Sequence, residues 1–108
     1  MAKKDLQGTL DLLVLKTLDQ KGEMHGYGIV LHVQRASVGP LAVEEGSLYP
    51  ALHRMEQSGW IKSNWALTES GRKAKYYRLT ADGRKELESA EKSFDQLVKD
   101  VRAVMRYT

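Results

Sequence analysis

The chain has 108 residues, of which 42% are hydrophobic and 29% are charged, and it contains no cysteine. This length supports one domain with a real core, and the composition is that of an ordinary globular protein. The lack of cysteine excludes disulfides, thiolate metal sites and thiol catalysis. Because we find no signal peptide and no apolar stretch long enough to cross a bilayer, we expect a cytoplasmic protein.

The net charge of +3 is concentrated in one part of the sequence. Residues 53–85 contain eight basic and three acidic residues, so this segment carries +5 and the rest of the chain carries −2. A local basic patch on a near-neutral protein is typical of binding to a polyanion. On charge alone, a solvated basic face without a partner is the alternative.

The first half of the chain predicts two helices. Leucine and valine residues recur at helical spacing and favour a helix over 6–21, which the pair Lys21-Gly22 ends. Its apolar arc is wide, so we expect burial on more than one side. A turn over 22–26 and a shorter helix over 27–36 follow. Residues 41–43 are compatible with a short edge strand.

A third helix is predicted over 47–58, with Ser47 at its start. Pro50 is compatible with this helix because it lies in the first turn, where its missing N–H has no helical partner. Four apolar residues are expected to face the core: Leu48, Ala51, Leu52 and Met55.

Aromatic and β-branched residues next predict a hairpin, with strands over 60–65 and 75–80 and a turn at Ser70-Gly71. The four aromatic residues of these strands are expected to be mostly packing residues, and a side chain left exposed could stack against a planar ligand. They are Trp60, Trp65, Tyr76 and Tyr77.

The last helix is predicted over 81–106, with Thr80 as its N-cap. Its apolar residues follow a heptad pattern for nearly three repeats, and such a stripe is too long for one small domain to cover. We therefore expect a homodimer, with the first helix as the second wall of the interface. The expected interface residues are Leu6, Leu10, Leu13, Leu87, Ala90, Phe94, Leu97, Val101 and Val104.

No pattern in the sequence is typical of catalysis. The histidines His25, His32 and His53 have neither triad nor metal-site spacing. Glu44-Glu45 is interpreted as charge at a helix entry, and Gly26-Tyr27-Gly28 lacks the spacing of a phosphate loop. We therefore expect no enzyme, no catalytic residue, no cofactor and no metal.

A short helix that leads directly into a basic hairpin indicates a winged helix-turn-helix, in which the helix enters the major groove of DNA. The fold class expected is α+β, mostly α, with a winged domain over 1–80 and a dimerisation helix over 81–108. Arg72, Lys73 and Lys75 lie close together near the hairpin tip, with no acidic residue between 71 and 80. The expected DNA-binding residues are Ser47, Tyr49, His53, Arg54, Arg72, Lys73 and Lys75.

The chain resembles the PadR family of transcriptional regulators over nearly its whole length. The resemblance is carried by the runs Gly8-Thr9-Leu10-Asp11, His25-Gly26-Tyr27-Gly28-Ile29, Gly46-Ser47-Leu48-Tyr49-Pro50-Ala51-Leu52, Glu56-Gln57-Ser58-Gly59-Trp60-Ile61 and Gly71-Arg72-Lys73-Ala74-Lys75-Tyr76-Tyr77-Arg78-Leu79-Thr80, and by Gly83. The third of these runs is the most specific.

This resemblance implies a dimeric repressor that binds a palindromic operator and releases it when an effector arrives. The single C-terminal helix resembles the short subgroup, some members of which bind flat molecules between tryptophans at the dimer centre. This chain has no tryptophan in its last helix, and Phe94 is the only large aromatic residue on the seam. The effector therefore stays open, and a protein-interaction module that does not bind DNA is the alternative function.

Overall fold

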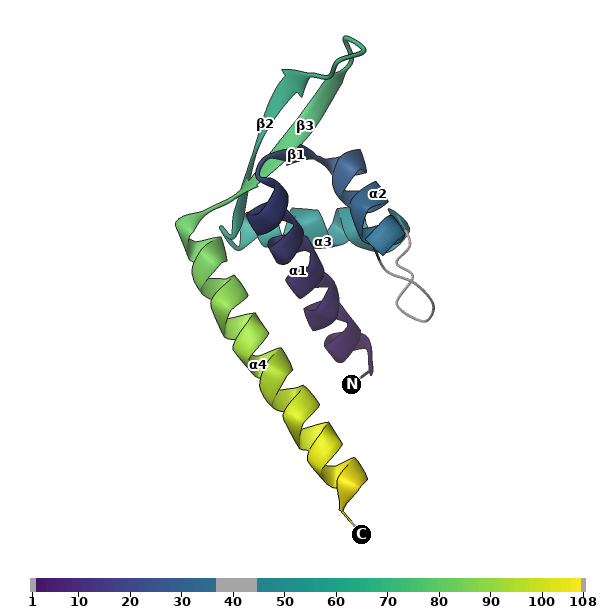
Figure 1. Ribbon diagram of the computed structural model, residues 1–108. Helices are drawn as coiled ribbons and strands as arrows, with labels where there is room; N and C mark the ends of the chain where they lie inside the picture. Colours follow the sequence, from purple (N-terminus) through teal and green to yellow (C-terminus); the bar gives the residue numbers. More distant parts are fainter. Residues whose placement is uncertain (1, 37–44, 108) are drawn as a thin grey trace.

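Four helices and a three-stranded antiparallel sheet form the fold, as seen in a computed structural model (Figure 1). The structure describes residues 2–36 and 45–107, with side chains for 8–36 and 46–107. The elements are α1 (Ala2–Lys21), β1 (Met24–His25), α2 (Gly26–Ala36), α3 (Glu45–Gln57), β2 (Ile61–Leu67), β3 (Lys73–Leu79) and α4 (Ala81–Arg106). The predicted class, a mostly helical winged helix with a long last helix, is confirmed.

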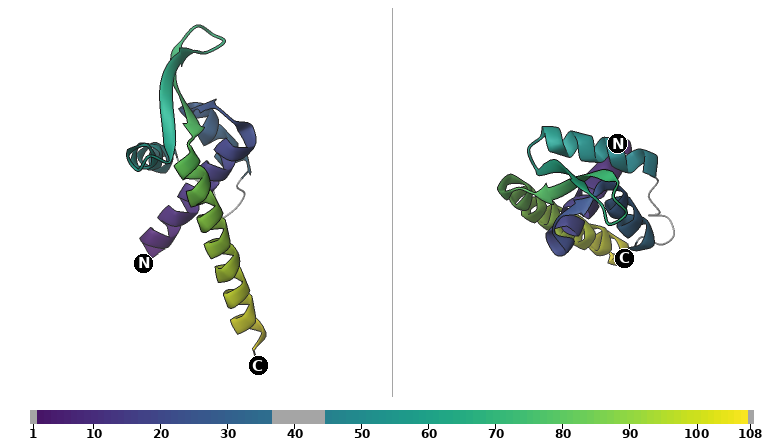
Figure 2. Two further views of the ribbon diagram at one scale, coloured as in Figure 1. Left: turned by 90° about the vertical axis from the view of Figure 1, so that its left-hand side faces the viewer. Right: turned by 90° about the horizontal axis from the view of Figure 1, so that it is seen from above.

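The molecule is long because two elements extend from opposite ends of its body. Its principal extents are 60 × 29 × 23 Å. The hairpin β2–β3 projects from one end, and α4 runs away from it at the other end (Figures 1 and 2). Both chain termini lie on the side of the body away from the hairpin (Figure 1).

Helix α1 is the centre of the core. It contacts α2, α3, α4 and β3, which agrees with the wide apolar arc predicted for it. The buried apolar side chains form one cluster: Leu10, Val14, Leu15, Leu18, Ile29, Val30, Val33, Leu48, Ala51, Leu52, Met55, Ile61, Tyr77 and Leu87. Thr17 is also buried, and its hydroxyl donates to the Leu13 carbonyl at 2.7 Å, so no polar group is left unpaired there.

The sheet contains one strand that the sequence did not predict. Met24 and His25, expected in a turn, form β1 and pair with Tyr77 and Tyr76 of β3. This short strand covers the edge of β3 next to the core, where unpaired backbone groups would be costly. Gly22 ends α1 as predicted, with φ at +78° and its N–H donating to the Leu18 carbonyl at 2.9 Å.

The other predicted elements agree to within a few residues. Helix α1 begins four residues earlier than predicted, and the hairpin is longer, with a loop of only five residues, 68–72, between its strands. The bounds of α4 are as predicted, and Thr80 caps it by accepting from the Gly83 N–H at 2.9 Å. The edge strand expected over 41–43 lies outside the described residues.

Two ion pairs link α4 to α1. Lys16 pairs with Glu91 at 3.2 Å, and Arg84 pairs with Asp19 at 2.8 Å. Surface pairs of this kind contribute little stability each, so the apolar contact of Leu87 with the core is the main attachment of α4. Among the described residues, no helix combines the length and the apolar character needed to cross a membrane.

Candidate nucleic-acid interface

Helix α3 has a buried face and an exposed face. The four apolar residues predicted to face inward are all buried, and α3 packs against α1, α2 and β2. Ser47, Tyr49 and His53, predicted to contact DNA, lie on the exposed face. The helical spacing of apolar residues therefore separated the two faces correctly.

Tyr49 also has a structural contact that the sequence did not reveal. A Cβ added to Gly26 would lie 3.1 Å from the Tyr49 ring and 3.5 Å from the Tyr77 ring. Glycine at the start of α2 therefore lets the Tyr49 ring from α3 approach its backbone closely. The exposed part of Tyr49 lies next to the N-terminus of α2.

Arg54 does not extend freely from α3. Its guanidinium forms an ion pair with the Asp11 carboxylate of α1, and both side chains are largely covered. Burial raises the pKa of the Asp11 carboxyl, and the positive charge of Arg54 opposes this rise. Arg54 was expected to project from a polar face, so its tie to α1 is a correction of that expectation. Its expected contact with DNA stays a prediction.

Lys75 is likewise paired within the chain. Its ammonium lies 3.0 Å from a carboxylate oxygen of Glu56 on α3, and the Ser63 hydroxyl of β2 donates to the other oxygen. The hydrogen bond from Ser63 lowers the pKa of Glu56, and the one to Glu56 raises the pKa of Lys75. The basic cluster is free of acids in sequence, but Glu56 contacts it in space. This network joins the exposed helix to the hairpin.

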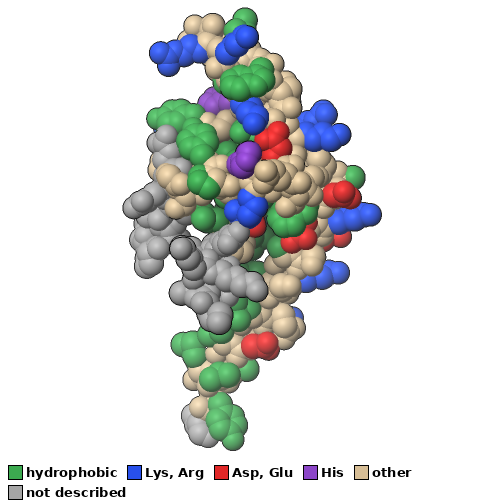
Figure 3. Space-filling view, turned by 180° about the vertical axis from the view of Figure 1, so that it is seen from behind, with side chains coloured by type: hydrophobic (Ala, Val, Ile, Leu, Met, Phe, Trp, Pro, Cys, Tyr) green, Lys and Arg blue, Asp and Glu red, His purple; other side chains and the backbone are tan. Residues whose placement is uncertain are grey.

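Arg72 and Lys73 are the exposed cations at the hairpin tip. The tip is a tight loop in which Gly71 has φ at +83° and donates its N–H to the Thr68 carbonyl at 2.9 Å. Figure 3 shows Lys and Arg side chains at this end of the molecule and hydrophobic side chains near its opposite end.

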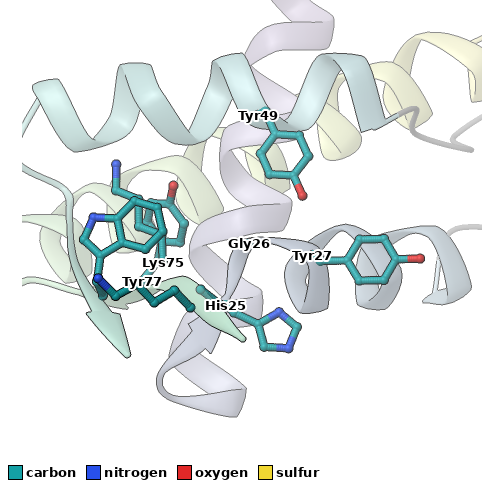
Figure 4. Close-up of a pocket in the computed structure, with 9 residues that line it drawn as sticks. His25, Gly26, Tyr27, Tyr49, Lys75 and Tyr77 are labelled. Atoms are coloured by element: carbon teal, nitrogen blue, oxygen red, sulfur yellow. The ribbon is translucent and has the colours of Figure 1, made fainter. Parts of the chain in front are cut away.

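A groove lies between the hairpin, the start of α2 and the outer side of α3 (Figure 4). Its volume is about 270 Å³. It brings together Tyr49, Lys73 and Lys75, which the sequence predicted as site residues, whereas Arg54 does not line it. Tyr27 and Trp65 also line it; Tyr27 was not expected there, and Trp65 was expected only as one of four aromatic strand residues that mostly pack. Alternation along the predicted strand could have placed Trp65 on the same face as the two lysines.

The apolar stripe of α4 is divided in two. Leu10 and Leu87, expected at a dimer interface, are buried in the core of the single chain. Leu13 and Ala90 are partly covered, and the side chain of Leu6 lies outside the described side chains. The residues farther along α4 are exposed: Phe94, Leu97, Val101 and Val104.

His25 has a role in the fold that its position in the sequence did not reveal. Its Nδ1 accepts the Gly28 N–H at 2.8 Å, which satisfies a backbone donor in the first turn of α2. In the described part of the chain, no three His, Cys, Asp or Glu side chains cluster closely enough to hold a metal ion.

Comparison with known proteins agrees with this geometry. The family model described as "Transcriptional regulator PadR-like family" matches residues 14–89. The transcriptional regulator Rv3488 of Mycobacterium tuberculosis is 30% identical over 86 residues, which cover 80% of this chain and 77% of that protein.

Solved structures give the same result over nearly the whole chain. A PadR-like transcriptional regulator from Bacillus cereus has a TM-score of 0.81 and 28% identity, covering 97% of this chain and 99% of its own. A PadR family regulator from Clostridium difficile has a TM-score of 0.77 and 31% identity, covering 89% and 97%. These similar proteins are transcriptional regulators rather than enzymes. With its helix, basic hairpin and matching family model, the chain belongs to the PadR-like family of transcriptional regulators, and this membership implies regulation through DNA binding.

Proposed function

We propose that this protein is a homodimeric repressor that binds a palindromic operator in the cytoplasm. The observation that carries the proposal is the exposed polar side of α3 beside a basic hairpin, at the opposite end of the molecule from an exposed apolar helix. The first surface suits DNA, and the second suits another copy of the chain. Each expected DNA contact is part of this proposal: Ser47, Tyr49, His53, Arg54, Arg72, Lys73 and Lys75.

The exposed apolar stripe of α4 supports the dimer. Leu97 is 58% exposed and Val104 is 74% exposed, although both lie on the heptad seam. Burying one large apolar side chain contributes about 1.5–3 kcal/mol. Several such side chains on each of two chains can outweigh the cost of association, estimated at roughly 4–15 kcal/mol. The exposed surface of α1 that includes part of Leu13 would form the second wall.

In such a dimer, two α3 helices would enter successive major grooves. Their half-sites would then be about one turn of DNA apart, ~34 Å. Repression would follow from occupying the operator. The basic hairpin would contact the phosphates, which fix position and supply salt-dependent affinity.

We also propose that a small-molecule effector changes the distance between the two α3 helices. A cavity of about 240 Å³ between α1 and α2 supports this idea, because Leu13, Val33 and Ala36 give it an apolar lining. It lies on the side of α1 that includes Leu13, where the partner is expected. A molecule bound there would favour one dimer geometry over another.

A salt titration tests DNA binding. Neutralising several phosphates makes log affinity fall linearly with log salt concentration, whereas apolar binding to a protein does not require this. Changing Arg72 and Lys73 to alanine should weaken binding to every duplex about equally and reduce the slope by about four units, because each of the two subunits loses two phosphate contacts. A flat slope for the unchanged chain would favour a protein-interaction module instead.

Sedimentation tests the dimer. The unchanged chain should sediment as a dimer at micromolar concentration, and Leu97→Asp should sediment as a folded monomer with weak operator affinity. Lys99→Asp, an exposed change on the same helix but outside the stripe, is the matched control and should remain dimeric. A monomer of about 12.2 kDa for the unchanged chain would refute the two-groove model.

A further inference from the structure

The two faces of the hairpin differ in character. In an antiparallel pair, residues directly opposite each other point to the same face, and successive residues alternate. The register pairs Ser63 with Tyr77, Trp65 with Lys75 and Leu67 with Lys73. These pairs therefore share one face, here called the inner face, which begins at the core with buried Ile61 and Tyr77. The outer face carries Lys62, Asn64 and Ala66 with their partners.

The inner face carries two large apolar side chains beyond the core. Trp65 is 66% exposed and Leu67 is 67% exposed. Their cross-strand partners are both lysines, so large apolar side chains and cations lie side by side near the hairpin tip. Neither large side chain is needed to complete the core cluster.

The inner face also borders the groove beside α3. Trp65 and Lys73 line that groove together with Tyr49 and Tyr27. Figure 4 shows these two tyrosines extending from α3 and α2. Because Lys75 is already paired with Glu56, an occupant of this surface would offer negative charge chiefly to Lys73 and apolar surface to the indole of Trp65. A DNA strand offers both, since phosphates alternate along it with the C–H surfaces of the deoxyribose rings.

We propose that Trp65 and Leu67 on the inner face of the hairpin form an apolar contact with the sugars of the operator strand that passes between α3 and the hairpin. This inference rests on the proposed function, because it assumes that the chain binds duplex DNA. Arg72 and Lys73 hold the phosphates of that strand. The apolar pair adds affinity without neutralising charge.

Salt dependence separates the two kinds of contact. Trp65→Thr keeps a residue that favours strands but removes the indole. It should weaken operator binding roughly tenfold at every salt concentration and leave the slope unchanged, because no counterion is released by an apolar contact. Lys73→Ala should instead reduce the slope by about two units, one for each subunit of the proposed dimer. Asn64→Thr, exposed on the outer face of the same strand, is the matched control and should bind as the unchanged chain does.

Fluorescence gives a second measurement that does not depend on affinity. In a Trp60→Phe variant, Trp65 is the sole tryptophan, and acrylamide should quench it less once operator DNA is bound. Equal quenching with and without DNA, or unchanged affinity in Trp65→Thr, would overturn the inference about the apolar contact. In that case, a steep salt dependence of the unchanged chain would still support DNA binding. If the unchanged chain does not bind duplex DNA at all, the proposed function fails together with this inference.

Discussion

Gly83→Ala should destabilise the protein, although alanine is the better helix former. A Cβ at this position would lie 2.0 Å from the Trp60 carbonyl oxygen and 2.8 Å from the Leu79 Cδ1. Ordinary contact begins near 3.4 Å, so the first turn of α4 must move by more than 1 Å. That movement pulls Gly83 away from the Thr80 hydroxyl, which caps the helix.

The expected loss of stability is the sum of two destabilising contributions and one stabilising contribution. Overpacking costs roughly 1–3 kcal/mol, loss of an N-cap costs about 1 kcal/mol, and replacing glycine within a helix returns about 1 kcal/mol. We therefore expect a net loss of about 2 kcal/mol. For a domain of this size, a loss of that order lowers the melting temperature by roughly 10 °C.

The assay is thermal unfolding followed by circular dichroism, with all variants at one protein concentration because the proposed dimer would melt in a concentration-dependent way. Gly8→Ala is the matched control, since Gly8 lies inside α1 and a Cβ there would meet no atom within 4 Å. It should raise stability by about 0.5–1 kcal/mol. Equal stabilisation by both substitutions would refute the close approach at Trp60.

Two further predictions concern the ion pairs beneath the proposed interface. Burial raises the pKa of the Asp11 carboxyl above its usual 3.8, so the folded state loses stability as this group ionises with rising pH. Asp11→Asn removes that cost. At pH 7 its free energy of unfolding should therefore be at least that of the unchanged chain. The same variant should bind DNA more tightly because Arg54 is released, and weaker binding would show that the pair holds Arg54 in its working position. The hydrogen bonds from Ser63 and Lys75 lower the pKa of Glu56 in the folded protein below its usual 4.5. The stabilisation of the folded state by these bonds is therefore present above pH 4.5 and is lost as pH falls through the pKa of Glu56 in the folded protein. Glu56→Gln should therefore be less stable than the unchanged chain at pH 7 and nearly equal near pH 3, and a constant difference between the two pH values would contradict this.

Local chemistry made most of the fold predictable. Helical spacing identified α3 and its buried face, and Thr80 marked the start of α4 to the residue. By contrast, β1 has only two residues and exists because the edge of β3 lies beside it. Such a strand has no signal of its own, since its partner is more than fifty residues away in the sequence.

The proposed site was predictable in position but not in its internal contacts. The basic hairpin and the exposed side of α3 follow from composition and periodicity. The partners of Arg54 and Lys75 do not, because Asp11 comes from a different helix and Glu56 lies nineteen residues before the lysine that it contacts. Tertiary packing decides which charges are neutralised within the chain, and a count along the sequence cannot reveal it.

The short length of β1 has a further consequence for solubility. It pairs with only two residues of β3, so among the described residues the backbone of β3 nearer the tip has no strand partner on the side away from β2. An open strand edge with apolar side chains invites pairing with the same edge of another molecule. Lys73 and Lys75 lie on that strand, and their like charges would oppose such stacking. Replacing them with uncharged residues therefore risks disordered aggregation of the free protein, and the same two lysines would protect the hairpin during the time it spends away from any partner.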